Sequence, residues 1–535
     1  MSINFRWGRF ASWCRKNGLF RAIVSWIFLA IIAYTLLSAI WGDGHGWNRV
    51  LTGWHIGATH DPLDRIKVTL TALGGVGAVG YLVIKYRERA ALERGEADEK
   101  LVRAVQQLGD PSPQVRIAGV YALTDVADTY KGPYHQRVVD ILCGYLRTDR
   151  LLKDTNGDTR YATNEDGTPN PDQPLSTDGP VESTILMVIA KHLKTVSENT
   201  ADNTTTPGPW SHCTLNLHGA TLTEPAHFTG SHIGTLNAQS LTLTRCTTFQ
   251  DSIFTGPAVF ANSIFVHDID FSGARFAQRA FFSNVTFKKK ADLTGAHFSS
   301  AHFDGATFEH RISFALTTFT ADTIFDNLNC IQETHFNDLD FSEFVSFKGA
   351  TFHRFVDFTG VNFADGTTFK YATFKRDAQF LGTTFMKRTN FSNSEFGGVA
   401  DFTGATFGAT SSFTDTTFGG STSFWGVTFT QKCIFHKTKF KHNAIFRRSL
   451  FSHDLSFMGA LFLHDADFWG AELKNRPQQD GIDYFLGASF NSGTGVNLHF
   501  PDSIRTNNKG LPEGAKWVPA PSNDQHRKGP TDEEG

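Results

Sequence analysis

Four oxygen-bearing side chains between residues 151 and 180 have the spacing of a calcium-binding loop. Asp154, Asn156, Asp158 and Glu165 occupy positions 1, 3, 5 and 12 of such a loop, and Ca2+ prefers hard oxygen ligands. Position 6, which the loop reserves for Gly, is Thr159, and no helix is predicted after it. The segment therefore has two interpretations, a calcium site or a plain exposed polar loop.

A group of Lys and Arg residues could bind an anionic partner. Residues 416–453 contain no Asp or Glu, while the stretch 432–448 within them is rich in Lys and Arg. Such a stretch can attract anionic lipid, nucleic acid or an acidic protein, although basic side chains also form solvated faces without a ligand. The candidate anionic-partner surface consists of Arg354, Lys375, Arg376, Lys437, Lys439, Lys441, Arg447 and Arg448.

Nothing in the sequence predicts catalysis or a cofactor. We find no GxSxG, no Gly-rich phosphate loop and no HExxH motif, which would position a nucleophile, a phosphate or a catalytic zinc ion. No set of His, Cys and Asp stands out, and a net charge of −3 gives no bulk attraction for nucleic acid. The cysteines lie far apart, which argues against a zinc site or a disulfide framework and predicts a reducing compartment. They are Cys14, Cys143, Cys213, Cys246, Cys330 and Cys433.

The elements that carry these residues follow from the phenylalanines, of which the chain has 50. From Phe303 to Leu473 apolar residues recur at alternating gaps of five and six, an 11-residue period, and 30 of the 32 positions are Phe. The same rhythm runs from Phe249 to Phe298, and a fainter version begins near Leu217. The step from Phe298 to Phe303 is five where six is due, so one residue is missing there.

This period predicts stacked β-strands and excludes a helix. On a helix, residues five apart point about 140° away from each other, and Thr, Gly and Ser are indifferent or poor helix formers. Small residues such as Ala400 and Ala405 precede many of the Phe by two positions, a spacing that puts both side chains on one face of a strand. Each unit is therefore predicted to be a short strand followed by a corner, and stacked units can pair with the coils on either side.

Segments such as ADLTGAHF at 291–298 and ADFTGATF at 400–407 resemble the pentapeptide-repeat family, whose pattern is A(D/N)(L/F)xx. The resemblance implies a right-handed, four-sided β-helix. Four sides would take 22 residues here because alternate units carry a sixth residue, which we expect to enlarge alternate corners. Phe358, Phe380, Phe402 and Phe424 would then stack as one inward column.

The 22-residue coil also places polar residues on the outside. One edge should contain Arg354, Arg376, His442 and His464, interrupted by Gly398 and Gly420. The resemblance also suggests DNA mimicry as a function, because the family's best-known soluble members mimic DNA with an acidic rod. Residues 212–500 hold 25 Asp and Glu against 22 Lys and Arg, so this role is not expected here.

Two apolar stretches near the N-terminus predict membrane-spanning helices. Residues 22–41 carry no charge and are long enough to cross a bilayer core of roughly 30 Å. A cleaved signal peptide is the alternative for this stretch.

A second uncharged stretch, 68–84 within a predicted span of 66–85, is shorter and rich in Gly, and a buried soluble helix is its alternative. Five Lys and Arg precede the first span and six follow the second, against two in the loop 42–65, so both ends are predicted to face the cytoplasm.

The remaining segments complete the predicted organisation. They are a basic cytoplasmic N-terminus over 1–21, a helical collar over 86–198 with the polar loop 151–180, a linker over 199–211, the β-helix with a C-terminal cap over 212–500, and a disordered tail over 501–535. The collar is predicted as three short helices in 97–150 and a fourth over roughly 181–196. The stretch AVQQLGDPSPQVRIAGVYALTDVAD at 104–128 resembles a bacterial subgroup of membrane-anchored pentapeptide-repeat proteins, which implies a multi-pass location in a bacterial cell membrane.

The predicted function is therefore that of a non-enzymatic scaffold, tethered to the membrane, that presents a cytoplasmic rod to protein partners. Two alternatives remain open. The chain could bind anionic lipid or nucleic acid through 432–448, although its net charge makes nucleic acid the less expected ligand. It could also be an accessory subunit of a membrane enzyme or transporter. The sequence predicts neither the partner nor the oligomeric state.

Overall fold

The computed structural model of the protein describes residues 62–194, 196–197, 205–474, 484–492, 497–501 and 504–519, together with Phe28, Ile31, Ile32 and Thr35. The chain divides into two compact units, Met1–Glu99 and Lys100–Gly535. Most of the first predicted span, 22–41, and most of the predicted loop 42–65 lie outside the described residues. Within the described ranges, we find no helix both long enough and apolar enough to cross a membrane.

The first long element is the helix α4 (Pro62–Leu108), which begins in the first unit and ends in the second. The sequence pattern predicts separate helices over 66–85 and from residue 97, whereas the structure has one. The residues between them are mostly Arg, Ala, Leu and Glu, which are strong helix formers. Ion pairs of 3.0 Å between Lys85 and Glu88 and between Arg89 and Glu93 add local support.

Three further helices form a small collar with one apolar core. They are α5 (Pro113–Tyr130), α6 (Pro133–Leu146) and α7 (Gly179–Leu193). Each has Pro in its first two positions, where the missing N–H costs nothing because no intrahelical partner exists there. Leu123, Leu142 and Ile185, one from each helix, are fully buried together in this core.

The polar segments around α7 contain strands that the sequence does not predict. Within 151–180, β1 (Tyr161–Thr163) and β2 (Pro169–Pro174) form an antiparallel pair. Gly167, with φ 83°, lies in the turn between them. β3 (Val196–Ser197) pairs with β4 (Thr205–Thr206), which lies inside the predicted linker. These strands cannot be predicted from composition alone. Gly, Pro, Asn and Asp indicate turns, but they do not show where each turn ends and a strand begins.

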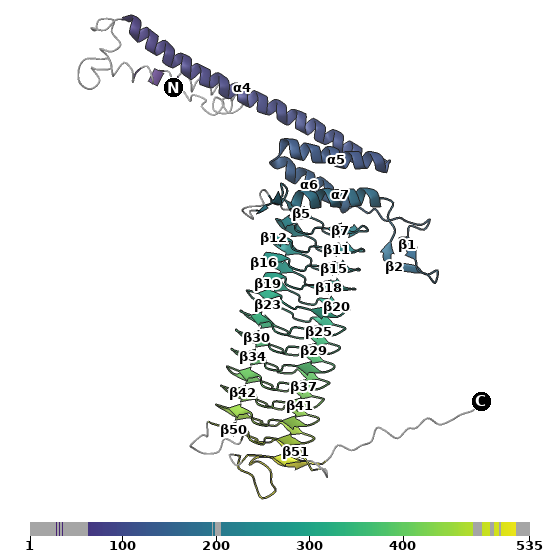
Figure 1. Ribbon diagram of the computed structural model, residues 1–535, viewed down its shortest axis with the longest axis vertical. Helices are drawn as coiled ribbons and strands as arrows, with labels where there is room; N and C mark the ends of the chain where they lie inside the picture. The colour runs from purple at the N-terminus through teal and green to yellow at the C-terminus, as the bar shows by residue number, and fades with distance from the viewer. Residues whose placement is uncertain are drawn as a thin grey trace, which may run out of the picture. The chain divides into compact units, whose positions relative to one another are not determined.

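The repeat region forms a solenoid with four short strands in each coil (Figure 1). One coil contains β28 (Thr351–Phe352), β29 (Val356–Asp357), β30 (Asn362–Phe363) and β31 (Thr367–Thr368), and β32 (Thr373–Phe374) begins the next. Thr351 pairs in parallel with Thr373, 22 residues further on. One face of the solenoid is a 14-stranded sheet that runs from β6 (Thr221–Leu222) to β53 (Lys516–Val518). The four-sided coil of 22 residues is thus confirmed.

Stacked Phe side chains fill the interior. Phe358, Phe380, Phe402 and Phe424 form one column in which neighbouring ring centroids are 4.7–4.9 Å apart. None of the four is exposed, and the small residues two positions before the Phe, such as Ala400, are buried too. The predicted inward column is therefore confirmed.

Successive corners alternate between two kinds. At a five-residue gap the Ala405 N–H donates to the Phe402 carbonyl oxygen (2.9 Å), and Gly404 between them has φ 69°. Such a turn needs a residue that tolerates the left-handed conformation. At the following six-residue gap, the Gly408 N–H donates instead to the carbonyl oxygen of Phe385 in the preceding coil (2.7 Å). The chain makes a wider bend there. The sixth residue enlarges alternate corners, as predicted.

The missing residue between Phe298 and Phe303 replaces one corner by long strands. β19 (His297–His302) runs through this position and pairs with β16 (Arg275–Phe281) on the preceding coil. Their pairing shifts from Arg275 with His297 to Arg279 with Ser300, so the coil loses one residue there.

The C-terminal end of the solenoid extends beyond the predicted cap. β53 pairs with β51 (Ser489–Asn491), with Trp517 opposite Phe490. Residues 516–518 belong to the segment 501–535 that the sequence predicts to be disordered. They form a strand because the last coil would otherwise present a row of unpaired backbone groups.

Candidate functional site

A buried ion pair joins the helical collar to the first coils of the solenoid. Glu182 in α7 is fully buried, and Arg150 Nη2 lies 2.9 Å from its Oε2. Glu182 Oε1 also accepts hydrogen bonds from the backbone N–H groups of Thr223 (2.6 Å) and Glu224 (3.0 Å). Burial raises the pKa of Glu224, and the nearby Glu182 carboxylate adds to the shift. The collar thus pairs backbone groups at the start of the solenoid and acts as its cap.

Two exposed tryptophans and two arginines lie on consecutive coils along one edge of the solenoid. Trp425 and Trp469 are 48% and 55% exposed, and Arg447 and Arg448 lie on the coil between them. The Arg448 N–H donates to the Trp469 carbonyl oxygen (3.0 Å), which fixes the order of the coils. Arg448 Cζ is 5.5 Å from the Trp469 ring centroid, and Arg447 forms an ion pair with Asp467. We call Trp425, Arg447, Arg448 and Trp469 the Trp–Arg edge.

The other predicted basic residues lie elsewhere on the solenoid. Arg354, Lys375, Arg376 and Lys441 lie at the wide bends that follow β28, β32 and β44 (Lys439–Phe440). Lys439 lies in β44, and Lys437, with φ 54°, occupies the turn before it. The candidate anionic-partner residues are therefore spread over several sides.

The edge predicted to hold Arg354, Arg376, His442 and His464 is present. The rings of His442 and His464 stack with centroids 5.1 Å apart. A Cβ on Gly420 would lie only 2.3 Å from the Gly398 carbonyl oxygen. The coils approach too closely there for side chains, so the two glycines divide the edge into two basic groups.

The predicted calcium ligands do not converge. Asp154 Oδ1 accepts hydrogen bonds from the backbone N–H groups of Asn156 and Asp158 (2.9 Å each), as in a tight Asx turn. Glu165 lies in a different turn, between β1 and β2. The carboxylates of Asp154, Asp158 and Glu165 form no group that could share an ion within the described part of the chain.

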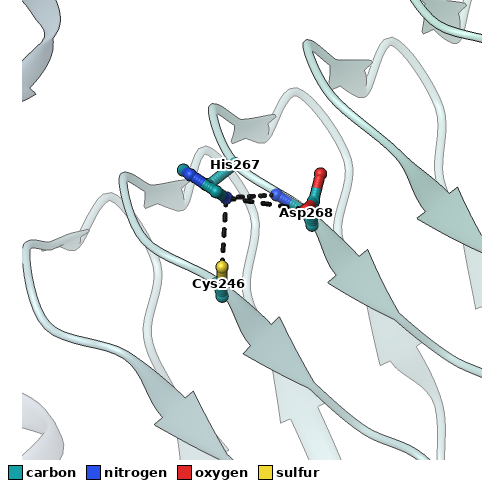
Figure 2. Close-up of side chains that lie close together, drawn as sticks. All are labelled: Cys246, His267 and Asp268. Carbon is teal, nitrogen blue, oxygen red and sulfur yellow. Dashed lines mark hydrogen bonds and ion pairs between the residues drawn. The ribbon is translucent and has the colours of Figure 1, made fainter.

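One exposed cluster on the solenoid does bring metal-binding atoms together (Figure 2). Cys246 Sγ lies 3.0 Å from His267 Nδ1, and this nitrogen lies 3.9 Å from Asp268 Oδ2. All three ligand atoms lie within 4.8 Å of one another, the one such group of three among the described residues. Burial raises the pKa of the Cys330 thiol to about 12, whereas Cys246 is the exposed free cysteine in the described part of the chain.

The backbone fixes the geometry of this cluster. Cys246 precedes β11 (Thr247–Thr248) and Asp268 precedes β15 (Ile269–Asp270) on the next coil, where Thr247 pairs with Ile269. The Thr247 N–H donates to the Asp268 carbonyl oxygen (3.1 Å). A surface hollow of about 230 Å3 adjoins the cluster, and Cys246 and Asp268 line it with residues of both strands. Cys246 and Asp268 therefore lie one above the other at the rim of this hollow.

The profile of the pentapeptide-repeat family, described as nine copies of the repeat, matches this region. The matched segments are 238–286, 282–328, 347–395, 380–428, 391–439 and 424–472. These segments of the solenoid are similar to the pentapeptide-repeat family. Comparison with the curated proteins and with the solved structures finds no match to the chain.

The cluster on the pentapeptide-repeat solenoid could have been found from the sequence. Cys246 and Asp268 are 22 residues apart, the length of one coil, and His267 precedes Asp268. The signal is hidden because Cys246 lies before Phe249, in the stretch where the Phe rhythm is faint. The Trp–Arg edge follows the same rule, since Trp425, Arg447 and Trp469 are spaced by 22 residues. A search for basic residues alone misses its tryptophans.

Proposed function

We propose that this protein is a non-enzymatic scaffold whose solenoid binds an acidic protein surface through the Trp–Arg edge. The observation that carries the proposal is the exposure of Trp425 and Trp469 on either side of Arg447 and Arg448. Trp and Arg are the residue types that most often dominate the energy of protein interfaces. Arg447 is paired with Asp467, so it is Arg448 beside Trp469 and the absence of Asp and Glu over 416–453 that favour an acidic partner.

The interior of the solenoid supports a role that uses the outer surface. Phe side chains such as Phe303 and Phe314 are among the largest fully buried groups, so they fill the space that a ligand would need. Repeat solenoids expose extended surfaces, and each coil contacts mainly its neighbours. A rigid surface loses little conformational entropy on binding.

We further propose that residues 22–85 tether the scaffold to a membrane, with the solenoid in the cytoplasm. The uncharged stretch 22–41 and the excess of Lys and Arg outside the loop 42–65 support this. In α4, Val79, Leu82 and Val83 are at least half exposed, as expected of side chains that contact lipid. Reporter fusions after residue 100 and at residue 535 should both report the cytoplasm. An external signal from either fusion would contradict the cytoplasmic orientation.

The partner proposal is tested in living cells by proximity labelling from the C-terminus of the full chain. The double variant Trp425→Ala and Trp469→Ala should lose labelled proteins that the wild type retains. Met386→Ala is the control because Met386 is similarly exposed, at 51%, but lies on another corner. An identical set of labelled proteins in the wild type and the double variant would refute the proposal.

A salt series separates this proposal from binding to an anionic polymer or lipid. Purified full chain is mixed with nucleic acid or with vesicles that contain phosphatidylserine, and Lys437→Gln with Lys441→Gln is compared with the wild type. The proposal predicts no binding to either. Salt-sensitive binding that these substitutions weaken would favour the anionic-ligand role.

A further inference from the structure

We propose that Cys246, His267 and Asp268 bind a transition-metal cation of the Zn2+ type, with one coordination position open to solvent. This site is independent of the proposed partner-binding role, because it lies on a different part of the solenoid. It contains one thiolate sulfur, one imidazole nitrogen and one carboxylate oxygen, a mixed set that Zn2+ accepts. The thiolate disfavours Ca2+ and Mg2+, which prefer oxygen ligands.

Two of the three distances between the ligand atoms are close to those around one shared ion, and the third, between Cys246 and Asp268, is within 4.8 Å. Zn2+ lies about 2.3 Å from sulfur and about 2.0–2.2 Å from nitrogen and oxygen, so tetrahedral ligands are roughly 3.3–3.6 Å apart. In the structure, Cys246 Sγ and His267 Nδ1 are 3.0 Å apart, and His267 Nδ1 and Asp268 Oδ2 are 3.9 Å apart. Shifts of about half an ångström would bring both pairs into that range, which exposed side chains can make by small rotations.

Hydrogen bonds around the cluster set the tautomer of His267 and the orientation of the Asp268 carboxylate. The Asp268 N–H donates to His267 Nδ1 (2.9 Å), which requires an unprotonated nitrogen at that position. This is the tautomer that a metal ion needs, with the proton on Nε2, and on binding the ion would take the Nδ1 lone pair in place of this hydrogen bond. The backbone N–H of Lys290 donates to Asp268 Oδ1 (3.1 Å). That hydrogen bond fixes the carboxylate through Oδ1, and Oδ2 then faces His267. Hydrogen bonds from outside the coordination sphere orient ligands in metal sites in the same way.

The surroundings favour a cation and leave room for a fourth ligand. Asp270 and Asp292 line the adjoining hollow of about 230 Å3 with Asp268, and these carboxylates attract positive charge. Lys290 also lines it, and its ammonium group, 3.0 Å from Asp292 Oδ2, neutralises one of these three carboxylates, so the hollow keeps a net negative charge. Water can occupy the open position from the hollow. On binding, the Cys246 thiol would release its proton to solvent, and the thiolate would coordinate the metal in its place.

Cobalt titration of the full chain in detergent tests the proposal. Co2+ is the probe because a thiolate ligand gives a charge-transfer band that solvent-exposed carboxylates do not give. The titration uses a Cys14→Ser background, because Cys14 lies outside the described residues, among which Cys246 is the exposed free cysteine. We expect one equivalent of Co2+ per chain with this band, displacement of Co2+ by Zn2+, and release of one proton.

Single substitutions identify the ligands. Cys246→Ser should abolish the charge-transfer band, and His267→Ala and Asp268→Asn should weaken binding at least about 10-fold. His310→Ala is the matched control, because His310 lies at the corresponding wide bend two coils further on without a neighbouring cysteine. All four side chains are on the surface, so thermal melting should show that each variant remains folded. The absence of a band in the wild type, or an unchanged band in Cys246→Ser, would refute the site.

Discussion

The Phe column makes a quantitative prediction for Phe402→Ala. Phe402 is fully buried, and its ring stacks between Phe380 (4.7 Å) and Phe424 (4.9 Å). It also meets Phe391 and Phe413 edge-on at 5.6 and 5.8 Å. Truncation to Ala removes these contacts, together with those to Phe396 and Phe407, and leaves a cavity in the centre of the coil.

The free energy of unfolding should fall by about 3–5 kcal/mol, the usual cost of a core Phe→Ala change. Each lost aromatic pair contributes about 0.5–1.5 kcal/mol beyond the buried area. The cavity cannot collapse easily, because the backbone hydrogen bonds of Phe402 to Ser423 (2.8 Å) and of Phe380 to Asp401 (2.7 Å) hold the coils at a fixed spacing. We therefore expect a value in the upper half of the range.

Chemical denaturation of the full chain, followed by the far-ultraviolet signal of the solenoid, measures this loss. Phe402→Leu also removes the aromatic contacts but keeps an inward apolar side chain, so it should cost clearly less than Phe402→Ala. Met386→Ala removes a side chain that is 51% exposed and should change stability by no more than about 0.5 kcal/mol. If Phe402→Ala and Met386→Ala unfold at the same denaturant concentration, the stacked core does not stabilise the fold as described.

Three further predictions concern stability. Arg150→Met should cost about 3–5 kcal/mol because it leaves the buried Glu182 carboxylate without its cation, and adding Glu182→Gln should recover much of the loss in a denaturant titration. Leu316 has φ 59°, a left-handed conformation that is sterically unfavourable for Leu but not for Gly. Leu316→Gly should therefore raise the free energy of unfolding by up to about 1 kcal/mol, which a slightly higher melting temperature would show. Burial lowers the pKa of several histidines, which stay neutral in the folded state while the unfolded chain takes up protons near pH 6.5. Stability should therefore fall as the pH is lowered from about 7.5 to 5.5, and thermal melts across this range measure it. These residues are His135, His232, His335, His353 and His436.

The sequence predicts the solenoid well because its rule is local and repeated. An inward Phe every five or six residues determines the coil length, so the column through Phe402 and the shared edge of His442 and His464 could both be predicted. The collar has no such repetition. Its buried contact between Arg150 and Glu182 joins residues 32 positions apart that no periodic pattern relates. The pair β1 and β2 is hidden for a similar reason, because its polar residues satisfy a turn pattern and a strand pattern equally well.

The two sites proposed on the solenoid should act independently of each other. Each coil of a solenoid contacts mainly the coils above and below it, so a local change loses its effect within a few coils. Cys246 and Asp268 lie on adjacent coils near the collar, whereas Trp425 and Trp469 lie near the far end of the repeats. Between them, the residue missing after Phe298 also breaks the regular register. Zinc bound at Cys246 should thus leave the affinity of the Trp–Arg edge for its partner unchanged. A strong dependence of that affinity on zinc would mean that the partner contacts both sites at once.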